Sequence, residues 1–158
     1  MFKWLLTCLL LVSSTAYAYD ENGERYCLAQ NMYFESGGES TAGQLAVGLV
    51  TLNRVKMWQY PNNVCDVVQQ GPTYINWKGS VLPKLNQCQF SWYCDGKPDW
   101  PEDSKTFEKM LELASLLLET EVYDFTDGSN HYHSIKVRPY WADHLEQTMT
   151  IDGHVFYK

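Results

Sequence analysis

Basic residues and long apolar segments are scarce in this sequence. Its 158 residues include 12 Lys and Arg against 19 Asp and Glu, which gives a formal net charge of −7, and the basic residues form no run. An acidic chain of this kind argues against nucleic acid or an anionic membrane surface as the partner. After residue 18, no stretch is long and apolar enough to cross a bilayer, so we expect no membrane anchor in the mature chain.

The first eighteen residues have the pattern of a secretory signal peptide. Lys3 supplies a short positive region, residues 4–12 are an apolar core, and Ala16-Tyr17-Ala18 is a small-residue cleavage site. Cys8 follows Thr7 within the apolar core, which argues against a lipoprotein anchor. We therefore expect cleavage after Ala18 and export to the periplasm, the cell wall or the medium. The remaining residues 19–158 suffice for one domain and are too few for two ordinary ones.

The cysteines of the mature chain show no Cys-x-x-Cys pair, which removes the main support for a zinc ribbon. Four cysteines follow residue 18, namely Cys27, Cys65, Cys88 and Cys94. In an exported protein an even number favours disulfides, and four cysteines allow three pairings. One of these joins Cys88 to Cys94 across a short loop and Cys27 to Cys65; the sequence leaves the other two open.

Apolar residues at helical spacing predict three helices. The first runs from about Cys27 to Glu35 and stops where Ser36, Gly37 and Gly38 supply turn chemistry. The second begins at Ser40 or Thr41, where residues 41–44 have a capping-box pattern, and ends near Val55. Asn53 and Arg54, at its end, are interpreted as structural residues that hold the following loop. The third helix is capped by Asp103 and continues to about Leu118.

The rest of the chain is predicted to be loops and short strands. Residues 56–103 contain so many Pro, Gly and Asn residues that only Val64 to Gln69 is expected to form a helical turn or two. Alternating segments in the tail predict strands over residues 130–135, 149–151 and 154–157, of which the last two form a hairpin. This order of elements predicts an α+β fold that is mostly helical, with a small C-terminal antiparallel β-sheet.

Glu35 is the most unusual residue of the predicted first helix. A carboxylate at the C-terminal end of a helix faces the negative end of the helix dipole, and apolar neighbours such as Tyr33 and Phe34 add a desolvation cost. Both effects raise the pKa of the carboxyl group. A carboxyl group that keeps its proton near neutral pH is what a glycosidase needs to protonate a leaving oxygen. The alternative is an ordinary solvated acid in a surface loop.

Several motifs in order resemble the cell wall hydrolase family typified by spore cortex-lytic enzymes. The first is YFESGGESTAGQLAVGLVTLNRV, which keeps that family's Glu, Gly-Glu, Gly-Gln, Ala-Val and Asn-Arg-Val elements at Glu35, Gly38, Glu39, Gly43, Gln44, Ala46, Val47, Asn53, Arg54 and Val55. It departs from the family at Ser36 and Gly37, where Ala and Arg are usual. The Phe-Ser segment near Trp92, His131-Tyr132-His133, Pro139-Tyr140-Trp141 and the closing residues 151–157 match later family motifs.

This resemblance implies a lysozyme-like fold and a peptidoglycan-cleaving activity. Glu35 would be the general acid and base that cuts the β-1,4 bond between N-acetylmuramic acid and N-acetylglucosamine. The reaction would be that of a lytic transglycosylase, which needs one acid and forms 1,6-anhydro products. The expected substrate-binding residues are Ser36, Trp92, Tyr132, His133 and Trp141. Glu39 and Gln44 are expected to be structural, and the enzyme is expected to be a monomer without metal or cofactor.

Three other interpretations remain open from the sequence. A muramidase that uses water would need a second carboxylate, for which Glu39, Asp124 and Asp127 are the candidates. His131 and His133 lie on one face of a predicted strand and, with His144 or His154, would bind zinc in a metal-dependent hydrolase. A glycan-binding module without catalysis is the third alternative. The sequence does not distinguish a bacterium that remodels its own wall from a phage that lyses its host.

Overall fold

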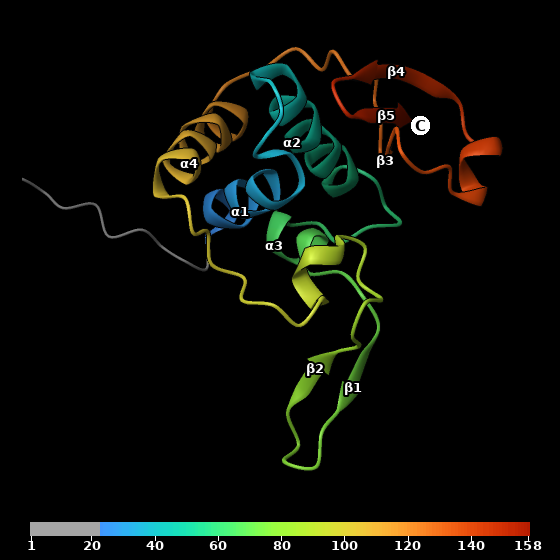
Figure 1. The fold of residues 1–158 in the computed structure, drawn as a ribbon. Helices are drawn as coiled ribbons and strands as arrows, with labels where there is room; N and C mark the ends of the chain where they lie inside the picture. The colour runs from blue at the N-terminus through green and yellow to red at the C-terminus, as the bar shows by residue number, and fades with distance from the viewer. Residues whose placement is uncertain (1–22) are drawn as a thin grey trace, which may run out of the picture.

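The computed structural model describes residues 23–158, and the predicted signal peptide lies outside them. Three helices form the body of the molecule: α1 (Glu24–Ser36), α2 (Thr41–Val55) and α4 (Ser104–Glu119) (Figure 1). They bury their apolar faces against one another, and the fully buried side chains include Leu28, Met32, Val47 and Met110. Within the described residues, no helix is both long and apolar enough to cross a membrane.

The three predicted helices are confirmed, with two differences at their ends. α1 begins at Glu24, one turn earlier than the apolar pattern indicates. α2 begins at Thr41, but its N-cap is Ser40, whose hydroxyl accepts a hydrogen bond from the Gly43 amide. The predicted capping box was therefore one residue out of place. Its Gln44 side chain instead donates to the carbonyl oxygens of Gly37 and Glu39, at 3.2 Å and 3.0 Å, and so holds the turn between the helices.

Two disulfides fix the region between α2 and α4. Cys27 of α1 is bonded to Cys65 of the short helix α3 (Val64–Val68), and Cys88 is bonded to Cys94 at the end of the 3-10 helix η1 (Ser91–Cys94). The first bridge anchors the loop-rich region to the helical body. Of the three pairings that the sequence allows, the structure therefore has Cys27–Cys65 with Cys88–Cys94.

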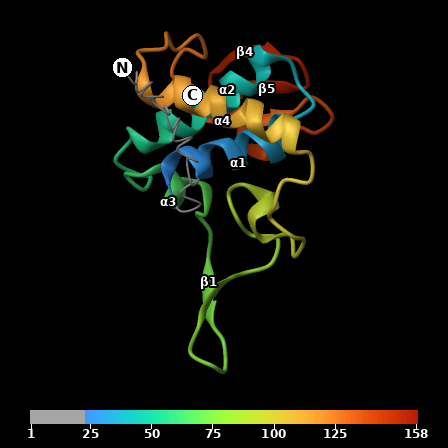
Figure 2. The same cartoon turned by 90° about the vertical axis from the view of Figure 1, so that its left-hand side faces the viewer.

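A two-stranded arm was missed by the sequence interpretation. Strands β1 (Thr73–Ile75) and β2 (Val81–Pro83) pair antiparallel, with Tyr74 opposite Leu82, and the hairpin extends away from the helical body (Figures 1 and 2). Its turn is organised by the Asn76 side-chain oxygen, which accepts hydrogen bonds from the amides of Lys78 and Ser80. Strands of three residues are too short to produce a recognisable alternation.

The C-terminal sheet has three antiparallel strands in the order β3-β5-β4. They are β3 (His131–Ser134), β4 (Gln147–Ile151) and β5 (His154–Tyr157), so the predicted hairpin is confirmed, with β4 beginning two residues earlier than expected. The sheet lies beside α2 at one end of the molecule (Figure 1), and buried Phe156 of β5 packs against Ala46 and Val50 of that helix. This contact places β3 opposite the C-terminal end of α1.

Candidate active site

Glu35 lies in the last turn of α1 and is half-buried. The hydroxyl group of Tyr132, from the first strand of the C-terminal sheet, donates a hydrogen bond of 3.0 Å to its Oε2 atom. The helix ends here because Gly37 and the exposed Gly38 follow and Gln44 holds their turn. Two elements that are 97 positions apart in sequence thus meet at this carboxyl group.

Burial raises the pKa of Glu35 above its ordinary value of 4.5. Two weaker effects act in the opposite direction: the hydrogen bond from Tyr132 and the positive charge of Arg54 both stabilise the carboxylate. A carboxyl group in this environment holds its proton to higher pH than a solvated glutamate does. It also has partners that stabilise its charge once the proton has left. Both properties suit a group that first donates and then accepts a proton.

Arg54 has a role near Glu35 that the sequence interpretation missed. Its Nε donates to the Asn130 carbonyl oxygen at 2.8 Å, so this hydrogen bond holds the segment before β3 rather than the loop after α2 that was predicted. Its guanidinium group is also buried among aromatic rings, 4.9 Å from the centroid of Phe90 and 5.4 Å from that of Tyr60. From there its charge acts on Glu35. Only the position of Arg54 in the Asn-Arg-Val motif signalled this, because its proximity to Glu35 depends on the tertiary fold.

Tyr132 and His133 point to opposite faces of β3. Tyr132 lies on the face toward α2, with its ring centroid 5.2 Å from that of His154 and 5.7 Å from that of Phe156. On the other face, the His133 ring nitrogens contact the Ser134 carbonyl oxygen and the Tyr157 hydroxyl, at 2.9 Å and 3.0 Å. Only Tyr132 of this pair contacts Glu35 directly.

Trp141 belongs to the face of the sheet that carries His133. It lies in the 3-10 helix η2 (Tyr140–Asp143), and its ring centroid is 5.2 Å from that of His131 and 5.6 Å from that of His133. It also contacts Tyr157 edge to face, at 5.5 Å. Trp141 and His133 therefore form an aromatic cluster on the face opposite to the Tyr132 contact.

Ser36 and Trp92 are more buried than substrate-binding residues usually are. The Ser36 hydroxyl donates to the Met32 carbonyl oxygen at 2.8 Å, inside α1. The Trp92 side chain is 8% exposed; its indole N–H donates to Asn31, and its ring stacks on Phe34 with centroids 4.6 Å apart. A sugar ring can therefore reach only the remaining edge of Trp92, which borders a cavity.

Glu39 connects the turn after α1 to the hairpin of the C-terminal sheet. Its Oε2 accepts a hydrogen bond of 3.1 Å from the Gly153 amide, and its Oε1 lies 4.0 Å from Nδ1 of His154. Next to it, the Asp152 carboxylate accepts hydrogen bonds from both the amide and the hydroxyl of Ser40. Glu39 thus joins two elements, whereas Gln44 holds the turn itself.

The other carboxylates considered as a second catalytic group are engaged in structural contacts. Asp124 accepts hydrogen bonds from Asn53 and from the turn residues Thr126 and Gly128. Burial raises the pKa of this carboxyl group, but the hydrogen bonds together outweigh burial and hold the pKa below its ordinary value. Asp127 lies on the surface, where the Lys158 ammonium group is 2.6 Å from its Oδ2. Each carboxylate that the sequence offered beside Glu35 stabilises a turn or the chain terminus.

The four histidines do not converge. His131 and His133 lie on one face of β3. His154 lies in β5, where it is paired with Ser134 of β3, and its ring faces Tyr132. His144 is exposed at the end of η2. Across residues 23–158, no group of three or more His, Cys, Asp or Glu side chains is arranged to hold a metal ion. The geometry gives the zinc interpretation no ligand set in this part of the chain.

Comparison with known proteins places this arrangement in a family. The sequence model described as Cell Wall Hydrolase matches residues 38–157. The chain belongs to the cell wall hydrolase family. The match covers Tyr132, Trp141 and the Gly-Gln and Asn-Arg-Val elements, and it begins three residues after Glu35. This cell wall hydrolase is an enzyme by family, so a glycan-binding module without catalysis is no longer a competing interpretation.

Two solved structures resemble this hydrolase over most of their length. The catalytic domain of the Bacillus cereus SleB protein is 24% identical, with a TM-score of 0.59, and the match covers 90% of this chain and 94% of that one. The catalytic domain of the germination-specific lytic transglycosylase SleB from Bacillus anthracis is also 24% identical, with a TM-score of 0.63 and coverages of 92% and 99%. A search among curated proteins finds no match. The likeness confirms the predicted lysozyme-like α+β fold.

Proposed function

We propose that this cell wall hydrolase is a lytic transglycosylase of peptidoglycan with Glu35 as its general acid and base. Its substrate would be the β-1,4 bond between N-acetylmuramic acid and N-acetylglucosamine. The observation that carries the proposal is the environment of Glu35: a half-buried carboxyl group at the end of α1 with a raised pKa, held by the Tyr132 hydroxyl. Such a group keeps its proton to higher pH than a solvated glutamate does and is stabilised as a carboxylate once the proton has left.

The reaction needs two proton transfers at one carboxyl group. Glu35 donates its proton to the glycosidic oxygen, and the bond from that oxygen to C1 of N-acetylmuramic acid breaks, with its electron pair going to the oxygen. The Glu35 carboxylate then takes the proton of the muramic 6-hydroxyl, whose oxygen bonds to C1. This step closes the 1,6-anhydro ring and returns the proton to Glu35 without consuming water. Tyr132 and Arg54 stabilise the carboxylate between the two steps.

A single-acid mechanism is supported by the contacts of the other carboxylates. Glu39 binds the β4–β5 turn, and Asp127 pairs with Lys158 at the surface. Asp124 accepts four hydrogen bonds, three from its own turn and one from Asn53. A hydrolase that inverts or retains configuration uses a second carboxylate across the scissile bond. The Bacillus anthracis relative is a lytic transglycosylase, which agrees with this proposal. The muramidase reaction with water is the alternative.

The cellular setting follows from the same proposal. Peptidoglycan lies outside the cytoplasm, and the two disulfides fit an oxidising compartment. We therefore retain a cleaved signal peptide at residues 1–18, one catalytic domain at residues 19–158, and a monomer that acts in the periplasm or at the cell wall. Remodelling of a bacterium's own wall and lysis by a phage both fit this setting.

Digestion of purified sacculi in ¹⁸O-labelled water tests the reaction type. Mass spectrometry should detect muropeptides that end in 1,6-anhydromuramic acid, one water lighter than the reducing products and without the label, because the attacking oxygen comes from the sugar itself. The Glu35→Gln variant should release soluble fragments about 10²–10⁴-fold more slowly. Labelled reducing ends from the wild type would contradict transglycosylation and establish hydrolysis.

Replacing Tyr132 by Phe should move the pH dependence of the reaction. The variant removes a hydrogen bond that favours the charged carboxylate, so the pKa of Glu35 should rise further. Activity that requires protonated Glu35 should then persist to higher pH, so the alkaline limb of the pH–rate profile should shift to higher pH. Turbidity clearance of sacculi across the pH range measures this limb. An unmoved or lowered limb would contradict the assignment of Glu35 as the acid.

A further inference from the structure

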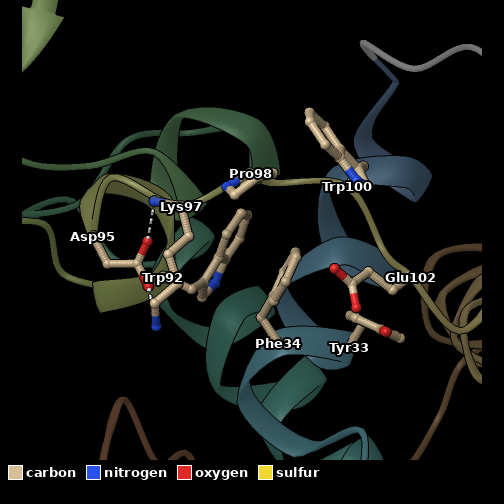
Figure 3. Close-up of a pocket in the computed structure, with 8 residues that line it drawn as sticks. All are labelled: Tyr33, Phe34, Trp92, Asp95, Lys97, Pro98, Trp100 and Glu102. Carbon is tan, nitrogen blue, oxygen red and sulfur yellow. Dashed lines mark hydrogen bonds and ion pairs between the residues drawn. The ribbon is translucent and has the colours of Figure 1, made fainter.

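A cavity of about 380 Å³ opens beside the last turn of α1 and is not used by the mechanism above. Figure 3 shows the rings of Phe34 and Trp92 face to face in it, with the Asp95–Lys97 ion pair at one end and Trp100 and Glu102 at the other. Cavities of this size accommodate small ligands in proteins. The lining combines a broad aromatic surface with a few polar groups, which is the composition that a sugar ring requires.

The floor of the cavity is held rigidly. Trp92 donates its indole N–H to Asn31 at 2.9 Å, and the Asn31 amide donates to Thr51 of α2 at 3.0 Å, all within the core. The loop between η1 and α4, on the other side of the cavity, is held to α1 because the Gln30 side chain donates to the Asp99 carbonyl oxygen at 2.5 Å. A ligand that enters therefore meets a preformed surface and pays little ordering cost.

Trp100 is the aromatic residue that a ligand can reach. Its side chain is 66% exposed, whereas Trp92 is 8% exposed and has one ring face covered by Phe34. An exposed indole at the rim of a cavity offers a flat apolar face to the C–H side of a sugar. The sequence interpretation chose Trp92 for this role because it lies in a family motif; the exposed ring in the same cavity is Trp100.

The charges around the cavity favour a neutral ligand. Asp95 and Glu102 outnumber Lys97, whose ammonium group is 3.3 Å from the Asp95 carboxylate. The peptide stems of peptidoglycan carry carboxylates, which this rim would repel. An N-acetylhexosamine ring has no charge, and its hydroxyl and acetamide groups can hydrogen-bond to both signs of side chain.

A second cavity, of about 460 Å³, borders the turn that follows Glu35. It shares Tyr33 and Phe34 with the first cavity and is also lined by Gly37, Gly38 and the N-terminal end of α4. A linear glycan needs such a succession of contacts. Glu35 lines neither cavity, and its carboxylate accepts a hydrogen bond from Tyr132 of the sheet. A sugar in the first cavity would therefore lie apart from the bond that is cut.

We propose that the cavity beneath Trp100 binds an uncharged N-acetylhexosamine ring of the glycan strand, distant from the cleavage point, with Trp100 as the stacking residue. This inference rests on the proposed glycan substrate and adds a binding site to it. Trp100 would hold the strand without taking part in the chemistry. Its loss should therefore raise KM on sacculi and leave kcat nearly unchanged.

Titration with tri-N-acetylchitotriose, followed by ¹H–¹⁵N NMR, tests the proposal. The indole N–H signal of Trp100 and the amides of residues 92–102 should shift, and Trp100→Ala should weaken binding about tenfold, as expected for the loss of one stacked aromatic contact. Trp100→Tyr should retain most of the affinity. Trp58→Ala is the matched control, because Trp58 is 95% exposed and lies elsewhere.

Two results would overturn the proposal: shifts confined to other regions, or equal affinities for the Trp100→Ala and Trp58→Ala variants. Preferential binding of a free stem peptide in the same cavity would do so as well. The titration does not depend on Glu35 or on cleavage. If Glu35→Gln still digests sacculi while chitotriose binds at Trp100, the catalytic proposal fails and the binding site stands. If Glu35→Gln is inactive while chitotriose does not bind at Trp100, the catalytic proposal stands and the binding site fails.

Discussion

Glu35→Gln should lower the rate of sacculus digestion by about 10²–10⁴-fold, the contribution typical of a positioned general acid or base. The amide keeps the shape of the side chain and still accepts the hydrogen bond from Tyr132, but it has no proton of suitable acidity to give to the glycosidic oxygen. Substrate binding should change little. Release of soluble muropeptides, measured by liquid chromatography at matched enzyme concentrations, gives the rate.

Glu108→Gln is the control for this substitution, because Glu108 is exposed on α4, away from Tyr132. It should digest sacculi at the wild-type rate. Glu35→Asp should lose activity as well, since the shorter side chain moves the carboxyl group away from its partners. A Glu35→Gln enzyme that retains more than about a tenth of the wild-type rate would exclude Glu35 from the role proposed for it.

The Glu35→Gln variant should be more stable than the wild type at neutral pH. Because burial raises the folded-state pKa of Glu35 above the value of 4.5 expected when unfolded, the wild type loses stability as the pH rises through the folded-state value. The amide does not titrate and has no such loss. The difference in melting temperature should therefore appear at neutral pH and vanish below pH 4.5. A gain in stability with a loss of activity is common at catalytic groups.

Removing the Cys27–Cys65 disulfide should lower the free energy of unfolding by about 2–4 kcal/mol. The bridge spans 38 positions, joins α1 to α3 and lies next to the core that contains Leu28 and Val64. Without it, the unfolded chain gains conformational entropy, and the loop-rich region after α2 loses its covalent anchor to α1. Guanidinium denaturation of the Cys27→Ala/Cys65→Ala double variant measures the change.

The second disulfide provides the comparison. Cys88 and Cys94 are six positions apart, so in the loop-entropy account their bridge constrains a smaller part of the unfolded chain. The Cys88→Ala/Cys94→Ala variant should lose about 2 kcal/mol or less. A larger loss at this bridge than at Cys27–Cys65 would contradict the view that the longer bridge anchors the fold.

Local sequence patterns predicted the elements that bury one continuous apolar face. The helices α1, α2 and α4 have stripes of several turns, and the Asp152-Gly153 turn between alternating residues defines the β4–β5 hairpin. The arm of β1 and β2 escaped because each strand has three residues, most of them exposed. Burial was also hard to predict for Trp92, whose surroundings come from α1 and α2 rather than from its own segment.

The candidate site could be predicted only in part for the same reason. The position of Glu35 at a helix end beside aromatic residues indicated a raised pKa, and the structure gives that direction. The approach of Tyr132 and Arg54 to this carboxyl group depends on how the sheet packs against α2. Neighbouring side chains of a strand point to opposite faces of a sheet, so the sequence was sufficient to predict that Tyr132 and His133 point to opposite sides. Trp100 lies in no family motif, so the sequence did not indicate a role for it. Only its exposure and the cavity below it in the structure indicate that it can bind a ligand.

The most direct test of the role of Glu35 is the titration of its carboxyl group. ¹³C NMR of protein labelled at glutamate side chains, assigned by the signal that disappears in Glu35→Gln, gives the pKa of this group in the folded enzyme. We predict a midpoint above 4.5 that coincides with the alkaline limb of the pH profile of sacculus digestion. A midpoint at or below 4.5, or an activity limb unrelated to it, would contradict the claim that Glu35 is the protonated acid of the reaction.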